Sequence, residues 1–157
     1  MQPIALSFPS RRPMAGNSNI VPLPSRRDEA AAAGIPVRSK SAAAVVLAGR
    51  GERAQVLLMQ RAGKTSRGLW SLVMGGLEAG ETAPQAARRE LMEEVGIAAG
   101  AIYNSGCCDT FYNPGANTID ITPIFVAPFP RAPAVILNEE HLDYRWVGFA
   151  EAMELIA

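Results

Sequence analysis

The stretch Gly75–Ile97 reads GGLEAGETAPQAARRELMEEVGI and is the most informative part of this 157-residue chain. Thr82 and Gln85 have the spacing of a capping box, which begins a helix. Gly96 is the residue type that most often ends one. We therefore predict a helix between Thr82 and Gly96, preceded by a glycine loop at Gly75-Gly76.

Three glutamates fall on one side of this predicted helix. At about 100° per residue, Glu90, Glu93 and Glu94 lie within one third of the circumference. Arg89 can pair with Glu93 one turn away, but no lysine or arginine along the helix is placed to neutralise Glu90 or Glu94. Hard carboxylate oxygens without a compensating base favour a hard cation, so we expect Mg²⁺, or Mn²⁺, shared with substrate phosphates.

A solvated acidic helix face would be the ordinary interpretation of three glutamates alone. The complete pattern is far more specific, because at background residue frequencies it arises by chance on the order of once in a billion windows. A cation held there would polarise phosphoryl oxygens and lower the pKa of a bound water. The neighbouring stripe of Leu91 and Val95 is expected to pack on a sheet.

Strand-like runs lie on both sides of the helix. Ala42–Ala48 and Gln55–Gln60 are expected to form a hairpin across a glycine-containing turn. Further strands are predicted at Ala101–Thr110, Ile119–Val126 and Tyr144–Val147, and a final helix at Glu151–Ile156. Strands before and after a helix indicate an α/β fold, a mixed sheet with helical cover.

The segment Gly75–Ile97 matches the Nudix box at every defining position, so the chain resembles the Nudix hydrolases. The resemblance extends from about Ser41 to the end and includes Leu57–Arg61 and Gly68-Leu69-Trp70. It implies an α/β/α sandwich around a mixed sheet. It also implies attack by water on an internal phosphorus of a nucleoside diphosphate linked to another group.

The resemblance also implies roles for individual residues. The expected metal ligands are Glu90, Glu93, Glu94 and the carbonyl of Gly75. Arg89 would orient the carboxylates, and Glu81 would brace the loop against the helix.

Glu140 is a further candidate, because family members often place an additional glutamate near the metals in a loop before a strand. It would act as a ligand or as the general base. The alternative is that Glu139-Glu140 is an ordinary exposed loop pair. His141, the sole histidine, is expected to be a hydrogen-bonded structural residue.

Four residues are candidates for substrate contact. Arg61 has the fork that phosphates favour, and Gly76 lets the backbone pass close to the metal or the phosphates. Tyr112 borders a Pro-Gly loop and is a candidate for ring stacking. Asp120 contacts the substrate or alternates outward on its strand.

Three further stretches, Glu78–Ala87, Tyr112–Gly115 and Glu140–Trp146, resemble bacterial dihydroneopterin triphosphate pyrophosphohydrolases, which also act on deoxynucleoside triphosphates. A small nucleotide or pterin triphosphate is therefore the expected substrate. An ADP-ribose or NADH pyrophosphatase is the alternative, since the Pro-Gly pair also resembles that branch. A nucleotide-sensing module without turnover is a third option, but such modules usually lack box carboxylates that are all present here.

Charge is unevenly spread over a chain with 15 basic and 15 acidic residues. Residues 1–40 hold several prolines and six arginines or lysines, so we predict an extended arm there and a domain over residues 41–157. Such an arm lies against its own domain or a partner subunit, which makes a homodimer one expected assembly. The remainder is net acidic, which argues against binding a nucleic-acid polymer.

Other features bear on the compartment. No apolar run approaches the roughly 18 residues that span a membrane, and no signal-peptide core follows the start. Cys107 and Cys108 are adjacent, so a stabilising disulfide between them is not expected. We expect two half-buried thiols in a strand, a reducing compartment and a cytoplasmic protein.

Overall fold

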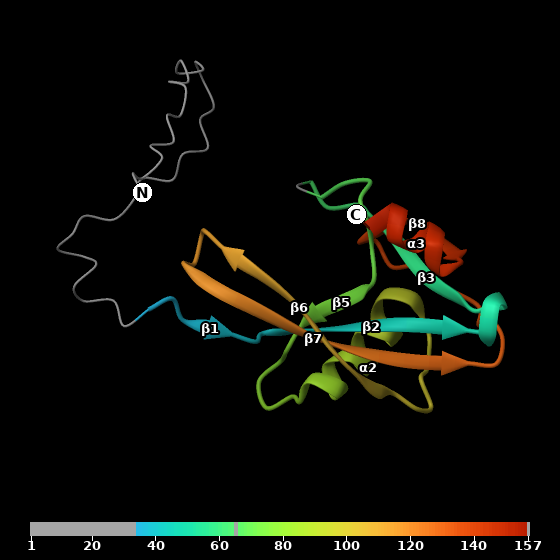
Figure 1. Ribbon diagram of the computed structural model, residues 1–157, viewed down its shortest axis with the longest axis horizontal. Helices are drawn as coiled ribbons and strands as arrows, with labels where there is room; N and C mark the ends of the chain where they lie inside the picture. The colour runs from blue at the N-terminus through green and yellow to red at the C-terminus, as the bar shows by residue number, and fades with distance from the viewer. Residues whose placement is uncertain (1–33, 65, 157) are drawn as a thin grey trace, which may run out of the picture. The chain divides into compact units, whose positions relative to one another are not determined.

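The computed structural model describes residues 34–64 and 66–156 (Figure 1). The compact unit begins at Ile35, six residues before the expected boundary at Ser41. The earlier start has a clear cause, because β1 (Val37–Arg38) pairs in parallel with β7 and so belongs to the sheet. Residues 1–33 of the expected arm lie outside the described residues.

A mixed eight-stranded sheet forms the framework of the described residues. Its path runs β1-β7-β2-β3-β4, while β5 pairs with β2, β6 with β7 and β8 with β3. β1 and β2 are parallel to β7, and the other pairs are antiparallel. The remaining strands are β2 (Ser41–Ala48), β3 (Gln55–Arg61), β4 (Trp70–Ser71), β5 (Val73–Gly76), β6 (Tyr103–Asn113), β7 (Thr118–Phe129) and β8 (His141–Val147).

The sheet forks between β2 and β3, which is the feature that makes room for the site. β2 pairs with β3 only at Leu47 and Ala48, next to the 3-10 turn η1 (Gly51–Arg53). Farther along, β2 pairs with β5 over Ser41–Ala44, while β3 pairs with β8 instead. Figure 1 shows β3 diverging from β2 beyond that turn. The free edge of β5 therefore faces the fork.

The helix α2 (Ala83–Val95) covers one face of the sheet, as predicted. Its capping box joins Thr82 and Gln85, and Gly96 ends it in the left-handed conformation at φ +67°. Leu91 and Val95 are fully buried against alternate residues of β2 and β3. Burying one such side chain contributes about 1.5–3 kcal/mol, so this stripe fixes the rotation of α2 about its axis and thereby the direction of its glutamates.

The helix α3 (Phe149–Ile156) covers the opposite face. Ala152 packs with Val56, Leu58 and Val147 in a second core cluster. In β3, Val56 and Leu58 alternate with Leu57 and Met59, which belong to the α2 side. The structure is thus an α/β/α sandwich around a mixed sheet, which confirms the predicted fold.

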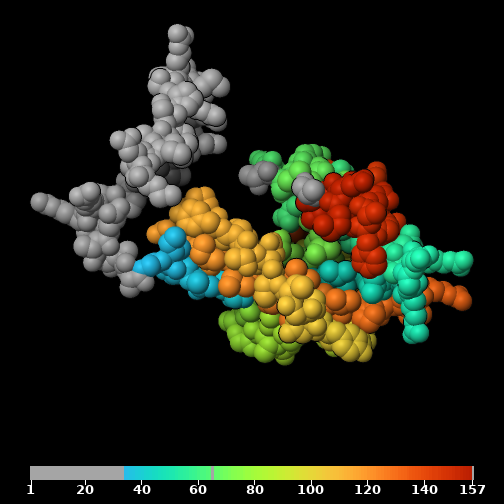
Figure 2. Space-filling view, in the orientation of Figure 1, coloured from blue at the N-terminus to red at the C-terminus, as the bar shows by residue number. Residues whose placement is uncertain are grey.

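The strand β6 differs from its prediction in length and in burial. It runs over Tyr103–Asn113, farther than the expected Ala101–Thr110. Cys107 and Cys108 lie in this strand as free thiols, but they are exposed, so the expected half-burial is wrong. β6 pairs with β7 alone among the described strands. Figure 2 shows it at the surface on the visible side of the molecule. Within the described residues, no helix has the length and apolar character needed to cross a membrane.

Candidate active site

The site begins with a close approach between β5 and α2. Gly75 and Gly76 were expected in a loop, but they end β5, where Gly75 pairs with Ala42 and Gly76 with Ser41. The carboxylate of Glu90 rises from α2 against Gly75, and a Cβ on that residue would overlap it. Space, and not backbone conformation, therefore requires glycine at this position.

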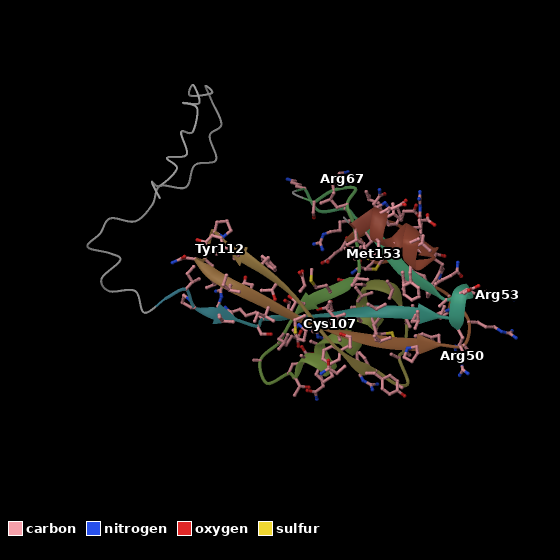
Figure 3. All side chains as sticks on the ribbon, viewed as in Figure 1. Arg50, Arg53, Arg67, Cys107, Tyr112 and Met153 are labelled. Atoms are coloured by element: carbon pink, nitrogen blue, oxygen red, sulfur yellow. The ribbon has the colours of Figure 1, made fainter. Side chains whose placement is uncertain are left out.

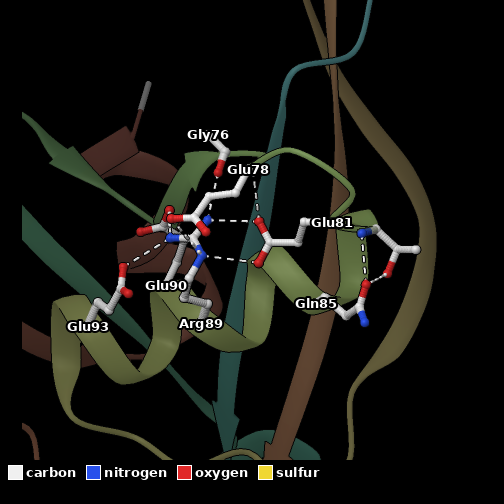
Figure 4. Close-up of polar contacts among 8 residues, drawn as sticks. Gly76, Glu78, Glu81, Gln85, Arg89, Glu90 and Glu93 are labelled. Atoms are coloured by element: carbon white, nitrogen blue, oxygen red, sulfur yellow. Dashed lines mark hydrogen bonds and ion pairs between the residues drawn. The ribbon is translucent and has the colours of Figure 1, made fainter.

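Arg89 gathers the polar groups around this contact (Figure 4). Its Nε donates to Glu81 Oε1 and its Nη2 donates to Glu81 Oε2, each at 3.0 Å. Its Nη1 donates to Glu90 Oε1 at 2.7 Å and to Glu93 Oε2 at 2.9 Å. Nη2 also donates to the carbonyl of Gly76 at 2.7 Å. One guanidinium thus connects the end of β5, the following turn and two glutamates of α2.

Arg89 was expected to pair only with Glu93 and Glu90 to have no base along the helix, but Arg89 also binds Glu90, so that prediction is wrong for Glu90. The planar guanidinium has several donors in a fixed fork, so it reaches the neighbouring carboxylate as well as the one a turn away. The hydrogen bonds from Arg89 lower the pKa of Glu81. In return, the hydrogen bonds to Glu81, Glu90 and Glu93 raise the pKa of Arg89. Glu81 also accepts from the backbone N–H of Glu78 at 3.0 Å, which closes the turn before α2.

Glu94 points into the fork and has a different environment. It is 4% exposed, and its Oε2 has no hydrogen-bond partner among the described residues. Burial, and next the charge of Glu90, raise its pKa to about 8, against a hydrogen bond from the backbone N–H of Met74. No helical lysine or arginine neutralises this carboxylate, as the sequence indicated. It is a buried acid with one oxygen unengaged.

Strand β8 brings a residue to Glu94 that the sequence did not assign to the site. His141 Nε2 lies 3.9 Å from Glu94 Oε2, and its Nδ1 lies 3.1 Å from Asn138 Oδ1. The backbone N–H of Asn138 donates to the carbonyl of Glu94 at 3.1 Å. Burial, then the charge of Arg61, lower the pKa of His141. The expected hydrogen-bonded histidine is confirmed, but its approach to Glu94 depends on strand pairing that no local pattern reveals.

A cavity of about 430 Å³ opens beside Glu94 and contains two of the predicted residues. It is lined by Arg61, Ala62, Gly63, Glu139 and Glu140. The backbone N–H of Ala62 donates to the carbonyl of Glu140 at 2.8 Å, which fixes the two walls together. The charges of Arg61 and Glu140 both act on the pKa of Glu94. The structure therefore brings Arg61, Glu140 and Glu94 into one region.

Two predicted substrate contacts are engaged elsewhere. Asp120 accepts hydrogen bonds from Arg38, Thr118 and Asn113, and those of Asn113 and Thr118 are the main causes of its lowered pKa. The hydroxyl of Tyr112 donates to Asn117 Oδ1 at 3.1 Å in the β6–β7 hairpin, and Figure 3 shows Tyr112 at that end. None of these hydrogen bonds involves a carboxylate of α2.

The fit of the site to a divalent cation rests on Glu94 and Glu90. In the described part of the chain, no three His, Cys, Asp or Glu side chains are gathered in an arrangement that holds a metal, since Glu90 and Glu93 turn to Arg89. Magnesium, however, usually takes only one or two carboxylates and completes its shell with waters and substrate phosphates. The unengaged oxygen of Glu94 beside Glu90 meets that requirement.

Comparisons with known proteins agree with this geometry. The family model for the NUDIX domain matches residues 37–157. The dihydroneopterin triphosphate diphosphatase of Escherichia coli (strain K12) is 33% identical over 114 residues, and the match covers 64% of this chain and 73% of that protein. The solved structure of the E. coli dihydroneopterin triphosphate pyrophosphohydrolase has a TM-score of 0.63 at 30% identity and covers 76% of this chain and 85% of that one.

Similarity also extends to a larger protein. An octanoyltransferase of Myxococcus xanthus is 34% identical over 126 residues, and the match covers 76% of this chain. The chain spans only 33% of that protein's length.

Proposed function

This chain belongs to the NUDIX domain family, and on that premise we propose that it is a metal-dependent pyrophosphohydrolase. Its proposed substrate is dihydroneopterin triphosphate or a (deoxy)nucleoside triphosphate, which it converts to a monophosphate and pyrophosphate. The similarity to the E. coli dihydroneopterin triphosphate diphosphatase supports this substrate class.

The observation that carries the proposal is the buried carboxylate of Glu94. Its Oε2 has no hydrogen-bond partner among the described residues, and burial, followed by the charge of Glu90, raises its pKa. An unengaged buried oxygen costs free energy unless a ligand engages it. A divalent cation held by Glu94 and Glu90 would offset both the missing partner and the repulsion between the two carboxylates.

Glu90 and Glu94, with Glu93 and the carbonyl of Gly75, would hold Mg²⁺ or Mn²⁺. When bound, the ion polarises phosphoryl oxygens and lowers the pKa of a coordinated water. Glu81 holds the guanidinium of Arg89, which in turn binds the carboxylates of Glu90 and Glu93 directly. Arg89 also balances their negative charge when the ion is absent. Of the three glutamates of α2, Glu93 is the most exposed, with 55% of its side chain open to solvent.

Arg61 and Glu140 are proposed to act on the substrate from the adjoining cavity. Arg61 donates to phosphate oxygens, while its Nε is held by Ser66 Oγ at 2.9 Å. The carboxylate of Glu140 accepts a proton from the attacking water. A new P–O bond then forms at the attacked phosphorus, and its bridging P–O bond between the monophosphate and pyrophosphate parts breaks.

A product assay tests this function. The full chain with Mg²⁺ is given dihydroneopterin triphosphate, the deoxynucleoside triphosphates, ADP-ribose and NADH in oxygen-18 water, and products are followed by phosphorus NMR. We expect pyrophosphate and a labelled or unlabelled monophosphate from a triphosphate, no product without divalent metal, and little from the Glu94→Gln variant. Two monophosphates from ADP-ribose or NADH alone would overturn the proposed substrate. Full activity in chelator would overturn the metal role.

A further inference from the structure

A cavity of about 450 Å³ lies on the face of the sheet opposite α2. Ala43 of β2 pairs with Met74 of β5 on one side and with Ile124 of β7 on the other, so these three side chains share one face. Leu72 and Ile156 add apolar walls. The volume lies within the range of about 300–1,000 Å³ that is typical of small-molecule sites.

The exposed strand β6 supplies the polar side of this cavity. Cys108 and Asp109 line it, and Asp109 is the one charged residue among the described lining residues. Asp109 is solvent-exposed, so its carboxylate is accessible to a ligand in the cavity. Figure 2 shows β6 and α3 on the same side of the molecule.

Met74 joins this cavity to the candidate active site. It lines the cavity, while its backbone N–H donates to the carboxylate of Glu94. That N–H lies on the edge of β5 that faces the fork, because the opposite edge of the strand pairs with β2. A substrate whose phosphates lie at Glu94 therefore has an apolar cavity on the other side of a single strand.

The chemistry of the lining selects one kind of ring. Apolar walls suit the faces of a planar heterocycle. A carboxylate accepts two parallel hydrogen bonds, which are offered by the adjacent ring N–H and amino group of a 2-amino-4-oxo ring, as in pterins and guanine. Adenine and cytosine place a bare ring nitrogen beside their amino group, and its lone pair would repel the carboxylate.

We propose that this cavity is the ring subsite of the substrate and that Asp109 selects a 2-amino-4-oxo ring by accepting from its N–H and its amino group. This inference rests on the proposed function, and it narrows the substrate class to pterin and guanine triphosphates. Asp109 is then a specificity residue with no part in the cleavage of the P–O bond.

The test uses ligands without phosphates, so that it does not depend on metal or turnover. Pterin, guanosine and adenosine are titrated into the metal-free full chain, with pterin followed by its own fluorescence. We expect pterin and guanosine to bind at least about tenfold more tightly than adenosine, and Asp109→Asn to lose about tenfold or more of that preference. Asp143→Asn, an exposed acid outside the lining, should keep it.

A second pair of variants tests the location. Ile124→Trp adds bulk on the cavity face of β7, whereas Ile121→Trp adds the same bulk on the opposite face of the same strand, which does not line the cavity. Pterin binding should weaken about tenfold in the first variant only. Equal affinity for the three ligands or no saturable pterin binding would each overturn the ring subsite. So would an affinity for pterin that is the same in the cavity variants and in their controls. Asp109-dependent pterin binding without hydrolysis of any triphosphate would instead overturn the proposed function and leave the subsite standing.

Discussion

His141 faces Glu94 across the fork of the sheet, with His141 Nε2 3.9 Å from Glu94 Oε2 and both side chains nearly enclosed. Asn138 fixes the other ring nitrogen at 3.1 Å and also binds the backbone of Glu94. This pair connects β8 to the middle of the acidic site. At 3.9 Å the two atoms make no hydrogen bond, so His141 limits the orientations of the Glu94 carboxylate by its position beside it.

Two substitutions separate orientation of Glu94 from simple packing. His141→Gln keeps a side-chain amide that reaches toward Glu94, whereas His141→Asn keeps only the nitrogen position near Asn138. We expect the Asn variant to lose about tenfold or more in turnover and in Mg²⁺ affinity, as partners of metal ligands commonly do, and the Gln variant to lose less. Steady-state kinetics and metal titration measure this. Equal losses in both variants would indicate packing alone.

The raised pKa of the buried Glu94 carboxyl leads us to expect that the stability of the metal-free protein depends on pH. Its folded pKa of about 8 lies above the ordinary glutamate value of 4.5, so the folded state binds more protons than the unfolded state between these values. The free energy of unfolding should then fall as pH rises from about 4.5 to about 8. Denaturant unfolding at several pH values should show this slope in the parent and a flatter one in Glu94→Gln. Identical slopes would contradict the buried charge.

The same variant gives a second result. Glu94→Gln should be as stable as the parent or more so above pH 8, because glutamine carries no charge into the core. Added Mg²⁺ should stabilise the parent and have little effect on the variant. A variant that unfolds at neutral pH would show that the carboxylate itself supports the fold.

Gly75→Ala should damage the site more than the fold. The new Cβ would overlap the carboxylate of Glu90, which is the movable end of a side chain, so the backbone need not shift. We expect a stability loss of about 1 kcal/mol but a fall in turnover of about tenfold or more, since Glu90 is displaced. Gly100→Ala, where a Cβ meets nothing within 4 Å, is the control. Unchanged turnover in Gly75→Ala would remove Glu90 from the proposed mechanism.

Local sequence accounts for the helix of the site, and long-range pairing accounts for the rest. The capping box, Gly96 and the Leu91 stripe are all encoded within a few turns, so α2 was predictable to its ends. The exposure of Cys107 was not, because it depends on which strands and helices cover β6. The approach of His141 to Glu94 likewise requires β8 to pair with β3 beside the fork.

Gly75 shows the boundary between these two cases. The sequence predicted that the Gly75-Gly76 backbone passes close to the metal or the phosphates, and in the structure the group that meets Gly75 is the carboxylate of Glu90. It did not indicate a strand, because two adjacent glycines are poor strand formers. Pairing of Gly75 and Gly76 with β2 overrides that local preference.

Arg88 and Arg89 are adjacent arginines of α2 that differ in their hydrogen-bond partners, so the same substitution at each provides a matched comparison. Arg89 makes five hydrogen bonds to Glu81, Glu90, Glu93 and Gly76, whereas Arg88 donates to the carbonyl of Ala99 at the surface. Lysine keeps the charge but lacks the planar fork. Arg89→Lys should therefore lower both the melting temperature and turnover, the latter by about tenfold or more.

Arg88→Lys should leave turnover and the melting temperature near those of the parent, since one exposed hydrogen bond contributes little. Thermal unfolding and steady-state kinetics of the two variants side by side provide the measurement. If Arg89→Lys also matched the parent, a single positive charge would be enough to hold Glu90 and Glu93. The bidentate contact with Glu81 would then have no part in orienting the metal-binding carboxylates.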